Sequence, residues 1–345
     1  MKALDLRNLK KEEILQRVGH MDQVAGILSL QAADGLARDS RIFEVWTGSG
    51  LSFSVLADRA LDIGDCHYKG ISLAWKSANG EVHPAYYEPE GEGWLRSYAG
   101  GLLVTCGLDQ FGYPNTDEGE ELGLHGRISN RPARYVNHQV SWQGDQYVLE
   151  ISGEVRQASV FGENLVLRRR ITSWMGSNKI RIEDIVKNEG YEMHPLMILY
   201  HFNLGYPLLS EHAQLHVNVD NTIPRDDNAK GGLEDWMNFH QPIKNYSEQV
   251  FQHMAVAESD GKVNVELINS DLGLGLKWTY EQKELPHLYQ WKMMGQGLYV
   301  LGVEPANCGG MHGRADARMK ENLTFLEPGE SCHFALEIEV VEYEQ

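Results

Sequence analysis

Short runs of strand-forming residues, separated by Gly, Asn or Asp, recur along almost the whole chain. Residues 51–56 alternate apolar and polar side chains, which is the period of a half-buried β-strand. Residues 140–142 and 147–151 flank Gln-Gly-Asp-Gln and predict a β-hairpin. Further strands are expected at 41–47, 165–172, 179–186, 196–201, 214–219, 263–268, 273–279, 298–304 and 333–341.

Many short strands with turn residues between them predict an all-β fold, an antiparallel sandwich or barrel. Residues 10–17 form a short amphipathic helical segment, and no βαβ unit or glycine-rich phosphate loop follows. We expect one domain over residues 1–345, with residues 1–20 as an N-terminal helical extension. The longest irregular stretches, 76–121 and 224–251, are where functional loops are expected.

Composition narrows the possible partners. Hydrophobic residues make up 42% and charged residues 23%, so the chain can bury a sizeable core. A formal net charge of −18 argues against nucleic acid and anionic membranes, which both attract clustered Lys and Arg. No apolar run is long enough to span a bilayer and no secretory signal is evident, so a cytoplasmic protein is expected. The four widely spaced cysteines predict free thiols.

Glu304 lies at the end of an apolar run that is expected to form a buried strand. Residues 299–303 are largely apolar, and Glu304 follows before Pro305 and a glycine-rich segment. Moving a carboxylate from water into a protein interior costs a large desolvation free energy. Proteins tolerate this cost where the carboxylate is needed as a general base. A glutamate whose charge is satisfied by backbone or by an arginine is the structural alternative.

Three other clusters carry candidate chemistry. His125 and Arg127 lie in a turn-forming segment with glycine between them, and His201 and Asn203 follow an apolar strand. Arg59 alternates with apolar neighbours, so an inward-pointing guanidinium would need a carboxylate or a ligand as its partner. Each of these residues could equally be structural.

Aromatic residues lie near these clusters in the sequence. A polar pocket with an aromatic floor suits a sugar, because sugar rings present apolar C–H faces. Each aromatic could also belong to the core. The set comprises Trp75, Tyr86, Tyr87, Trp94, Tyr98, Tyr289 and Trp291.

Several segments together resemble the aldose 1-epimerase (galactose mutarotase-like) superfamily, and more closely its DUF4432 branch. The resemblance covers nearly all of the chain after about residue 20. It rests on residues 58–64 (DRALDIG), 83–89 (HPAYYEP), 100–109 (GGLLVTCGLD), 123–127 (GLHGR), 200–207 (YHFNLGYP), 301–307 (LGVEPAN) and 326–330 (LEPGE).

The resemblance implies a β-supersandwich of antiparallel strands with one concave sugar-binding face. In mutarotases a glutamate takes the proton of the anomeric hydroxyl and a histidine protonates the ring oxygen, so that the ring opens and closes as the other anomer. On this resemblance Glu304 matches the base, and His125 matches the histidine that binds the sugar near its ring oxygen. The family motif would place the acid at Leu199, but this chain has His201 two residues later, which is our candidate for the acid.

The resemblance also implies a small-molecule sugar as partner and no cofactor, and a homodimer is a further expectation. Candidate sugar contacts are Arg59, Asp109, Arg127, Asn203, Gln290 and Trp291.

Three alternatives to an aldose 1-epimerase remain open from the sequence. The first is a sugar-binding protein without turnover on the same scaffold. The second is a metal-dependent sugar enzyme, although its histidines form no HxH pair and its one HxxxH pair lies in a predicted strand. The third is an epimerase of a modified or phosphorylated sugar, in which Arg59, Arg127 and Arg314 would grip a phosphate.

Overall fold

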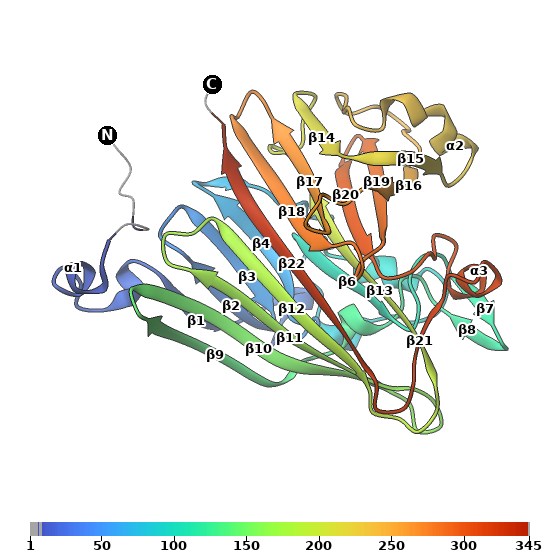
Figure 1. Cartoon of the computed structure of the whole chain (residues 1–345), viewed down its shortest axis with the longest axis horizontal. Coiled ribbons are helices and arrows are strands. Elements are labelled where there is room, and N and C mark those ends of the chain that lie inside the picture. The colour runs from blue at the N-terminus through green and yellow to red at the C-terminus, as the bar shows by residue number, and fades with distance from the viewer. Residues whose placement is uncertain (1–5, 7–8, 344–345) are drawn as a thin grey trace.

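Two large antiparallel β-sheets pack face to face in the computed structural model, which describes residue 6 and residues 9–343 (Figure 1). The first sheet has twelve strands. Ten of them follow one another in the order β1 (Gly26–Gln31), β2 (Arg41–Trp46), β3 (Leu51–Leu56), β4 (Asp62–Tyr68), β6 (Leu103–Leu108), β13 (His194–Leu204), β20 (Leu298–Ala306), β19 (His287–Gly295), β16 (Gln249–Ala255) and β15 (Val219–Pro224). The other two are β5 (Ile71–Ser72), paired with β4, and β21 (Thr324–Leu326), paired with β13.

The second sheet has eight strands, and a small hairpin lies outside both sheets. The order of the eight is β14 (Ala213–Val217), β17 (Lys262–Asn269), β18 (Leu274–Glu281), β22 (Ser331–Glu342), β12 (Lys179–Asn188), β11 (Asn164–Trp174), β10 (Gln146–Ala158) and β9 (Arg134–Gln143). The hairpin pairs β7 (Asn115–Asp117) with β8 (Glu120–Leu122).

Helices are short and lie between strands. The α-helices are α1 (Lys11–Leu15), α2 (Asp227–Gly231) and α3 (Arg314–Met319). Single 3₁₀ turns are formed by η2 (Met21–Gln23), η3 (Gly35–Ala37), η4 (Pro84–Tyr86), η5 (Gly93–Arg96), η6 (Ile128–Asn130) and η7 (Leu233–Asp235). No helix in the described part of the chain is long and apolar enough to cross a membrane.

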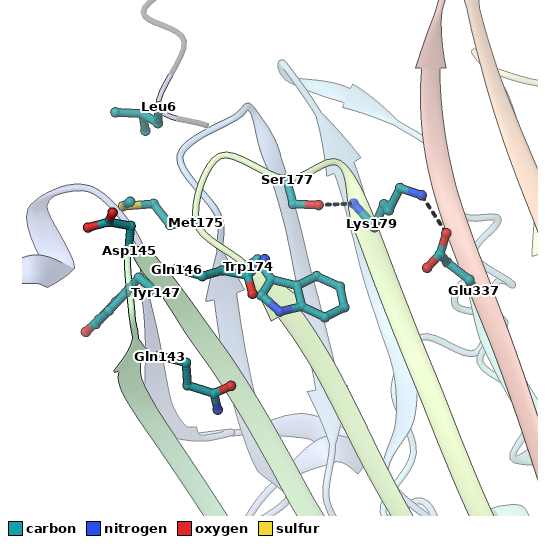
Figure 2. A pocket seen from close by; sticks show the side chains of 10 residues that line it. All are labelled: Leu6, Gln143, Asp145, Gln146, Tyr147, Trp174, Met175, Ser177, Lys179 and Glu337. Atoms are coloured by element: carbon teal, nitrogen blue, oxygen red, sulfur yellow. Dashed lines mark hydrogen bonds and ion pairs between the residues drawn. The ribbon is translucent and has the colours of Figure 1, made fainter. Parts of the chain in front are cut away.

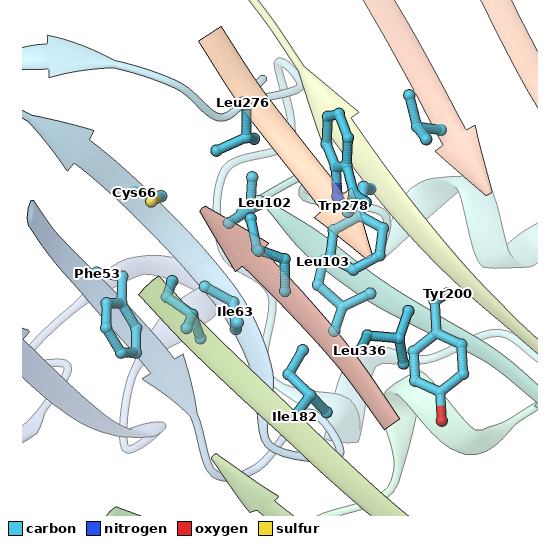
Figure 3. Close-up of a cluster of buried hydrophobic side chains, with 14 of the residues drawn as sticks. Phe53, Ile63, Cys66, Leu102, Leu103, Ile182, Tyr200, Leu276, Trp278 and Leu336 are labelled. Atoms are coloured by element: carbon cyan, nitrogen blue, oxygen red, sulfur yellow. The ribbon is translucent and has the colours of Figure 1, made fainter. Parts of the chain in front are cut away.

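The apolar core fills the space between the two sheets (Figure 3). Phe53 and Tyr200 reach into it from the twelve-stranded sheet, and Trp278 and Leu336 from the eight-stranded sheet. In β17 buried and half-buried residues alternate, as expected of a strand with one face on the core. In β13 every residue after His194 is buried, so both faces of this strand are covered. The face of β13 turned away from the core is therefore also enclosed.

A buried ionic network ties the sheets together. The Arg169 guanidinium donates to both Asp184 carboxylate oxygens at 2.9 and 2.7 Å, and to Asp62 of the opposite sheet at 2.8 Å. The Tyr200 hydroxyl donates to Asp184 at 2.7 Å. All four groups are buried. Because each charge has a partner of opposite sign, the network is tolerated inside the core.

The prediction of an all-β antiparallel sandwich is confirmed, with three corrections to the expected strands. The strand expected at 214–219 is two strands, β14 and β15, which belong to different sheets. Strand β20 does not stop at Glu304 but continues through Pro305, which pairs with Leu288. β13 likewise runs past His201 to Leu204. Of the expected N-terminal helical extension, residues 1–5 and 7–8 lie outside the described residues. In the described part α1 covers Lys11–Leu15, and residues 16–20 are not helical.

Candidate active site

A cavity of about 500 Å³ lies on the face of the twelve-stranded sheet that is turned away from the core. Alternation along β13 places Tyr200 and Phe202 in the core, whereas Leu199 and His201 line the cavity. Residues on either side of β6, such as Trp94 and His125, and residues just before β16, such as Glu248, contribute to its walls.

A second cavity, of about 590 Å³, lies near the start of the chain (Figure 2). It is lined by residues such as Gln143, Trp174 and Ser177, and its lysine, Lys179, is paired with Glu337 at 2.6 Å. No histidine lines it. Although it is the larger of the two, we place the candidate active site in the other cavity, which is lined by His125, His201 and Glu304.

Strand register brings Glu304 and His201 together. β13 and β20 pair with Leu199 opposite Ala306 and Phe202 opposite Val303, which puts His201 opposite Glu304. His201 Nε2 lies 3.2 Å from Glu304 Oε1, and the two residues are only 4% and 5% exposed. In the described part of the chain neither Glu304 Oε1 nor His201 Nδ1 makes a hydrogen bond.

Glycine at position 302 makes room for this contact. Gly302 precedes Glu304 by two residues, so a side chain there would point to the same face. A Cβ atom at this position would lie 2.9 Å from Trp291 Cβ and 3.3 Å from His201 Cε1, and closer still to Glu304 Oε1. Real Cβ atoms essentially never lie within 3.0 Å of another heavy atom, so any larger residue would displace the carboxyl group.

Burial shifts the protonation of all three titratable groups at the base of the cavity. Burial raises the pKa of Glu304 to about 8, with a further rise from the Glu248 carboxylate and a smaller opposing effect from Arg225. Burial lowers the pKa of His201 to about 3, assisted by His125, whose own pKa burial lowers to about 4. Burial therefore favours the uncharged form of all three groups.

His125 is held by a strained turn that fixes which ring nitrogen carries hydrogen. Its backbone has a φ of 56°, in the left-handed region that few non-glycine residues adopt. The Gly112 backbone N–H donates to His125 Nδ1 at 3.4 Å, and the His125 N–H donates back to the Gly112 carbonyl at 3.0 Å. Because Nδ1 accepts a hydrogen bond in a neutral ring, the hydrogen is on Nε2. His125 is thus a hydrogen-bond donor across the neutral pH range.

Aromatic rings form most of the cavity wall. Trp291 packs edge-on against Trp75 and His201, with centroid distances of 6.1 and 5.7 Å. Trp94 and Tyr98 stack at 4.4 Å, and Trp94 also contacts the His125 ring at 4.8 Å. Such a wall offers flat apolar surface around the polar groups at the base.

A second polar cluster lines the cavity beside Trp291. Glu248 accepts hydrogen bonds from the Trp291 indole N–H at 2.8 Å and from Arg225 Nη2 at 2.8 Å. Arg225 also donates from Nε to Asp226 at 3.0 Å and lies 4.9 Å above the Tyr113 ring. The charge of this arginine is therefore already matched by two carboxylates.

The sequence and the fold both match those of known proteins. The sequence profile of a family described as "Domain of unknown function (DUF4432)" matches residues 37–340. The chain belongs to the DUF4432 family. The resemblance of the sequence to DUF4432 is thereby confirmed. A search of curated proteins found no match.

Solved structures show the same fold. A Klebsiella pneumoniae protein with a provisional aldose 1-epimerase assignment superposes with a TM-score of 0.88 at 26% identity, covering 94% of this chain and 86% of its own. A galactose mutarotase-like protein from Clostridium acetobutylicum gives 0.67 at 13% identity, covering 93% and 99%. A galactose 1-epimerase from Lactobacillus acidophilus gives 0.59 at 12% identity, covering 93% and 100%. The DUF4432 chain thus has the galactose mutarotase-like fold.

Four of the residues expected at the site of this DUF4432 protein line the cavity. They are His125, His201, Trp291 and Glu304. Of the other aromatics named from the sequence, Tyr86 and Tyr87 lie outside the lining, whereas Trp75, Trp94, Tyr98 and Tyr289 belong to it.

Two more expected sugar contacts lie behind the wall instead of in it. Asn203 accepts from the Tyr98 hydroxyl at 2.5 Å and donates to the Gly101 carbonyl at 3.0 Å, so it holds a wall residue. Gln290 points to the opposite face of β19, where its amide bonds His253 at 2.9 Å and the Trp236 carbonyl at 2.8 Å.

The charged candidates also lie elsewhere. Arg59 is buried and donates to the Val82 carbonyl at 2.9 Å, and burial lowers its pKa against the opposing effect of nearby carboxylates. Asp109 accepts from Gln157 at 2.6 Å, and Arg127 lies 3.9 Å from it. These groups pair with the protein itself and do not line the cavity.

Sequence reasoning missed Glu248 and Arg225 as site residues. Both fall inside the irregular stretch 224–251, which was expected to carry function, at the end of β15 and just before β16. Their pairing depends on how these two strands meet, which no local motif reveals. Among the described residues no group of three or more His, Cys, Asp and Glu side chains is arranged to hold a metal ion.

Proposed function

We propose that this protein interconverts the anomers of an unphosphorylated sugar, as an aldose 1-epimerase. The observation that carries the proposal is the contact between Glu304 and His201 at the base of an aromatic cavity, with the Nε2–H of His125 beside it. Opening a cyclic hemiacetal requires one acid and one base at the two oxygens of the anomeric carbon. The Glu304–His201 pair supplies a carboxyl group and an imidazole for these two roles.

The remaining groups suit the same substrate. Aromatic rings such as Trp75 and Trp291 offer flat apolar surface to the C–H faces of a sugar, and Glu248 and Arg225 can bond its hydroxyls. His125 can donate to an oxygen of the anomeric centre and stabilise charge that develops there. The proposed reaction transfers protons at two oxygens while the bond between the ring oxygen and the anomeric carbon breaks and re-forms, and these protein groups can carry the protons.

A phosphorylated sugar is less compatible with this cavity. Arg225 is the arginine that lines it in the described part of the chain, and two carboxylates already neutralise that guanidinium. Arg59, Arg127 and Arg314, which could have held a phosphate, do not line the cavity. A phosphate would therefore enter beside the Glu248 carboxylate without a free cation to meet it.

Saturation-transfer NMR of anomer exchange across a panel of aldoses tests the proposal. We expect exchange above the buffer rate for at least one neutral sugar, reduced about 10²–10⁴-fold in Glu304→Gln and in His201→Asn. Glu234→Gln, an exposed change outside the cavity, is the matched control and should keep the wild-type rate. A sugar that binds the wild type without any exchange would favour a binding protein on the same scaffold.

A further inference from the structure

Two lone pairs cannot face each other at the base of the cavity. If Glu304 were ionised and His201 Nε2 carried no hydrogen, the two atoms 3.2 Å apart would repel. Glu304 Oε1 makes no hydrogen bond in the described residues, so a proton on one of these two atoms is what would make their close approach favourable. The contact therefore requires a hydrogen between these two atoms, carried either by the carboxyl oxygen or by Nε2.

The charged groups around Glu304 favour a proton on its carboxyl oxygen over a proton on His201 Nε2. The titratable and charged groups that face the pair are the Glu248 carboxylate, Arg225, the neutral His125, the hydroxyls of Tyr98 and Tyr289, and the Cys106 thiol. Arg225, the cation among them, is held by Glu248 and Asp226 at 2.8 and 3.0 Å. An ionised Glu304 would thus add a second negative charge near Glu248 at a buried position.

We propose that Glu304 and His201 work as one contact pair whose resting proton lies on Glu304, so that Glu304 is the acid that opens the sugar ring and His201 is the base. This assignment reverses the roles of glutamate and histidine in mutarotases, and it rests on the aldose 1-epimerase function proposed above. The directions of the pKa changes at both residues agree with it.

The proton transfers balance within the pair. Glu304 donates its proton to the ring oxygen as the bond from that oxygen to the anomeric carbon breaks. His201 Nε2 takes the proton of the anomeric hydroxyl, whose oxygen becomes the carbonyl of the open-chain aldehyde. A carboxylate and an imidazolium then lie in contact and stabilise each other. Rotation about the bond between C1 and C2 and reversal of both transfers close the ring as the other anomer and restore the neutral pair.

Direct contact between the acid Glu304 and the base His201 is compatible with a cyclic sugar as substrate. The two oxygens that exchange protons are attached to the same carbon, so neighbouring groups can reach both at once. A base on the far side of the ring would instead leave separated charges in a cavity of low dielectric. The neutral pair creates its charges side by side.

The resting proton is measured without substrate, by carboxyl ¹³C and histidine ¹⁵N NMR of the labelled full-length protein from pH 5 to pH 10. We expect one protonated carboxyl signal near pH 6.5 that is absent in Glu304→Gln, together with a neutral His201 assigned by comparison with His201→Asn. The exchange rate should fall about tenfold per pH unit above the midpoint at which that carboxyl ionises. In Glu248→Gln the midpoint should move to lower pH because the neighbouring negative charge is gone, while Glu234→Gln should leave it unchanged.

The outcomes separate this inference from the function on which it rests. Anomer exchange with an ionised Glu304 at rest, whether His201 is neutral or charged, would overturn the reversed roles and leave the aldose 1-epimerase intact. Absence of exchange for every sugar would overturn both. Exchange whose upper pH limit coincides with the carboxyl midpoint, and moves with it in Glu248→Gln, supports both.

Discussion

Replacing Glu304 by glutamine should stabilise the protein, and increasingly so as pH rises. The folded protein holds the Glu304 proton more tightly than the unfolded chain, because burial raises the pKa from its ordinary 4.5 to about 8. Below pH 4.5 the side chain is protonated in both states and costs nothing in charge. Between pH 4.5 and 8 the unfolded chain releases the proton first, so wild-type stability is progressively lost, and above pH 8 the loss is complete. Glutamine has no such proton to lose.

The magnitude follows from the two pKa values. A difference of one pKa unit corresponds to about 1.36 kcal/mol, so the change from 4.5 to about 8 amounts to about 5 kcal/mol in full. His201 acts in the opposite direction, because its lowered pKa makes stability rise with pH up to its ordinary value of 6.5. Above pH 6.5 His201 is neutral in both the folded and the unfolded state, so the pH dependence of the difference between variant and wild type in that range reflects Glu304.

Urea unfolding followed by tryptophan fluorescence, at several pH values from 4.5 to 9, measures the difference. The free energy of unfolding of Glu304→Gln minus that of the wild type should increase across this range by several kcal/mol, approaching about 5. Glu234→Gln should show a difference that does not change with pH. A flat difference for Glu304→Gln, within about 1 kcal/mol, would mean that Glu304 ionises like a solvated glutamate and would refute the electrostatic reasoning.

Three further changes test other parts of the structure. Gly302→Ala should lower the anomer exchange rate about 10²-fold by displacing Glu304, with an unchanged circular dichroism spectrum; a wild-type rate would contradict the close fit. Trp291→Phe removes an indole hydrogen bond at the cavity wall and should weaken sugar binding about tenfold by calorimetry, whereas unchanged affinity would place the sugar elsewhere. Arg169→Met leaves two buried carboxylates unpaired and should cost about 3–5 kcal/mol in urea unfolding. The exposed Arg170→Met on the same strand should cost less than about 1 kcal/mol, and equal losses would argue against the buried network.

The fold was predictable from the sequence because its signals are local. Alternation in segments such as 51–56 and the turn between β9 and β10 depend on neighbouring residues alone, and the structure contains them. The sequence did not show that residues 214–219 belong to two strands. The chain leaves β14 in one sheet and enters β15 in the other, and this change depends on which partners each strand pairs with. Pairing partners that are distant in sequence leave no such local trace.

The candidate site was only partly predictable, and strand geometry explains the difference. Gln290 and Trp291 are adjacent in β19, so their side chains point to opposite faces and the two cannot both contact one sugar. That exclusion could have been made from the sequence once β19 was recognised as a strand. Glu248 could not have been found this way, since its role depends on contacts with Arg225 and Trp291 that only the assembled sheet creates.

The two-residue displacement of the histidine has a definite structural consequence. A histidine at position 199 would lie opposite Ala306, about 6.6 Å along the strand from the place that His201 occupies. Glu304 would then have no nitrogen in contact, and an acid and a base would face a sugar from separate positions. At position 201 the histidine is on the same face but directly opposite Glu304, so the two become one proton-sharing unit. A change that preserves the face of a strand can therefore retain both residue types and still alter which of them holds the proton.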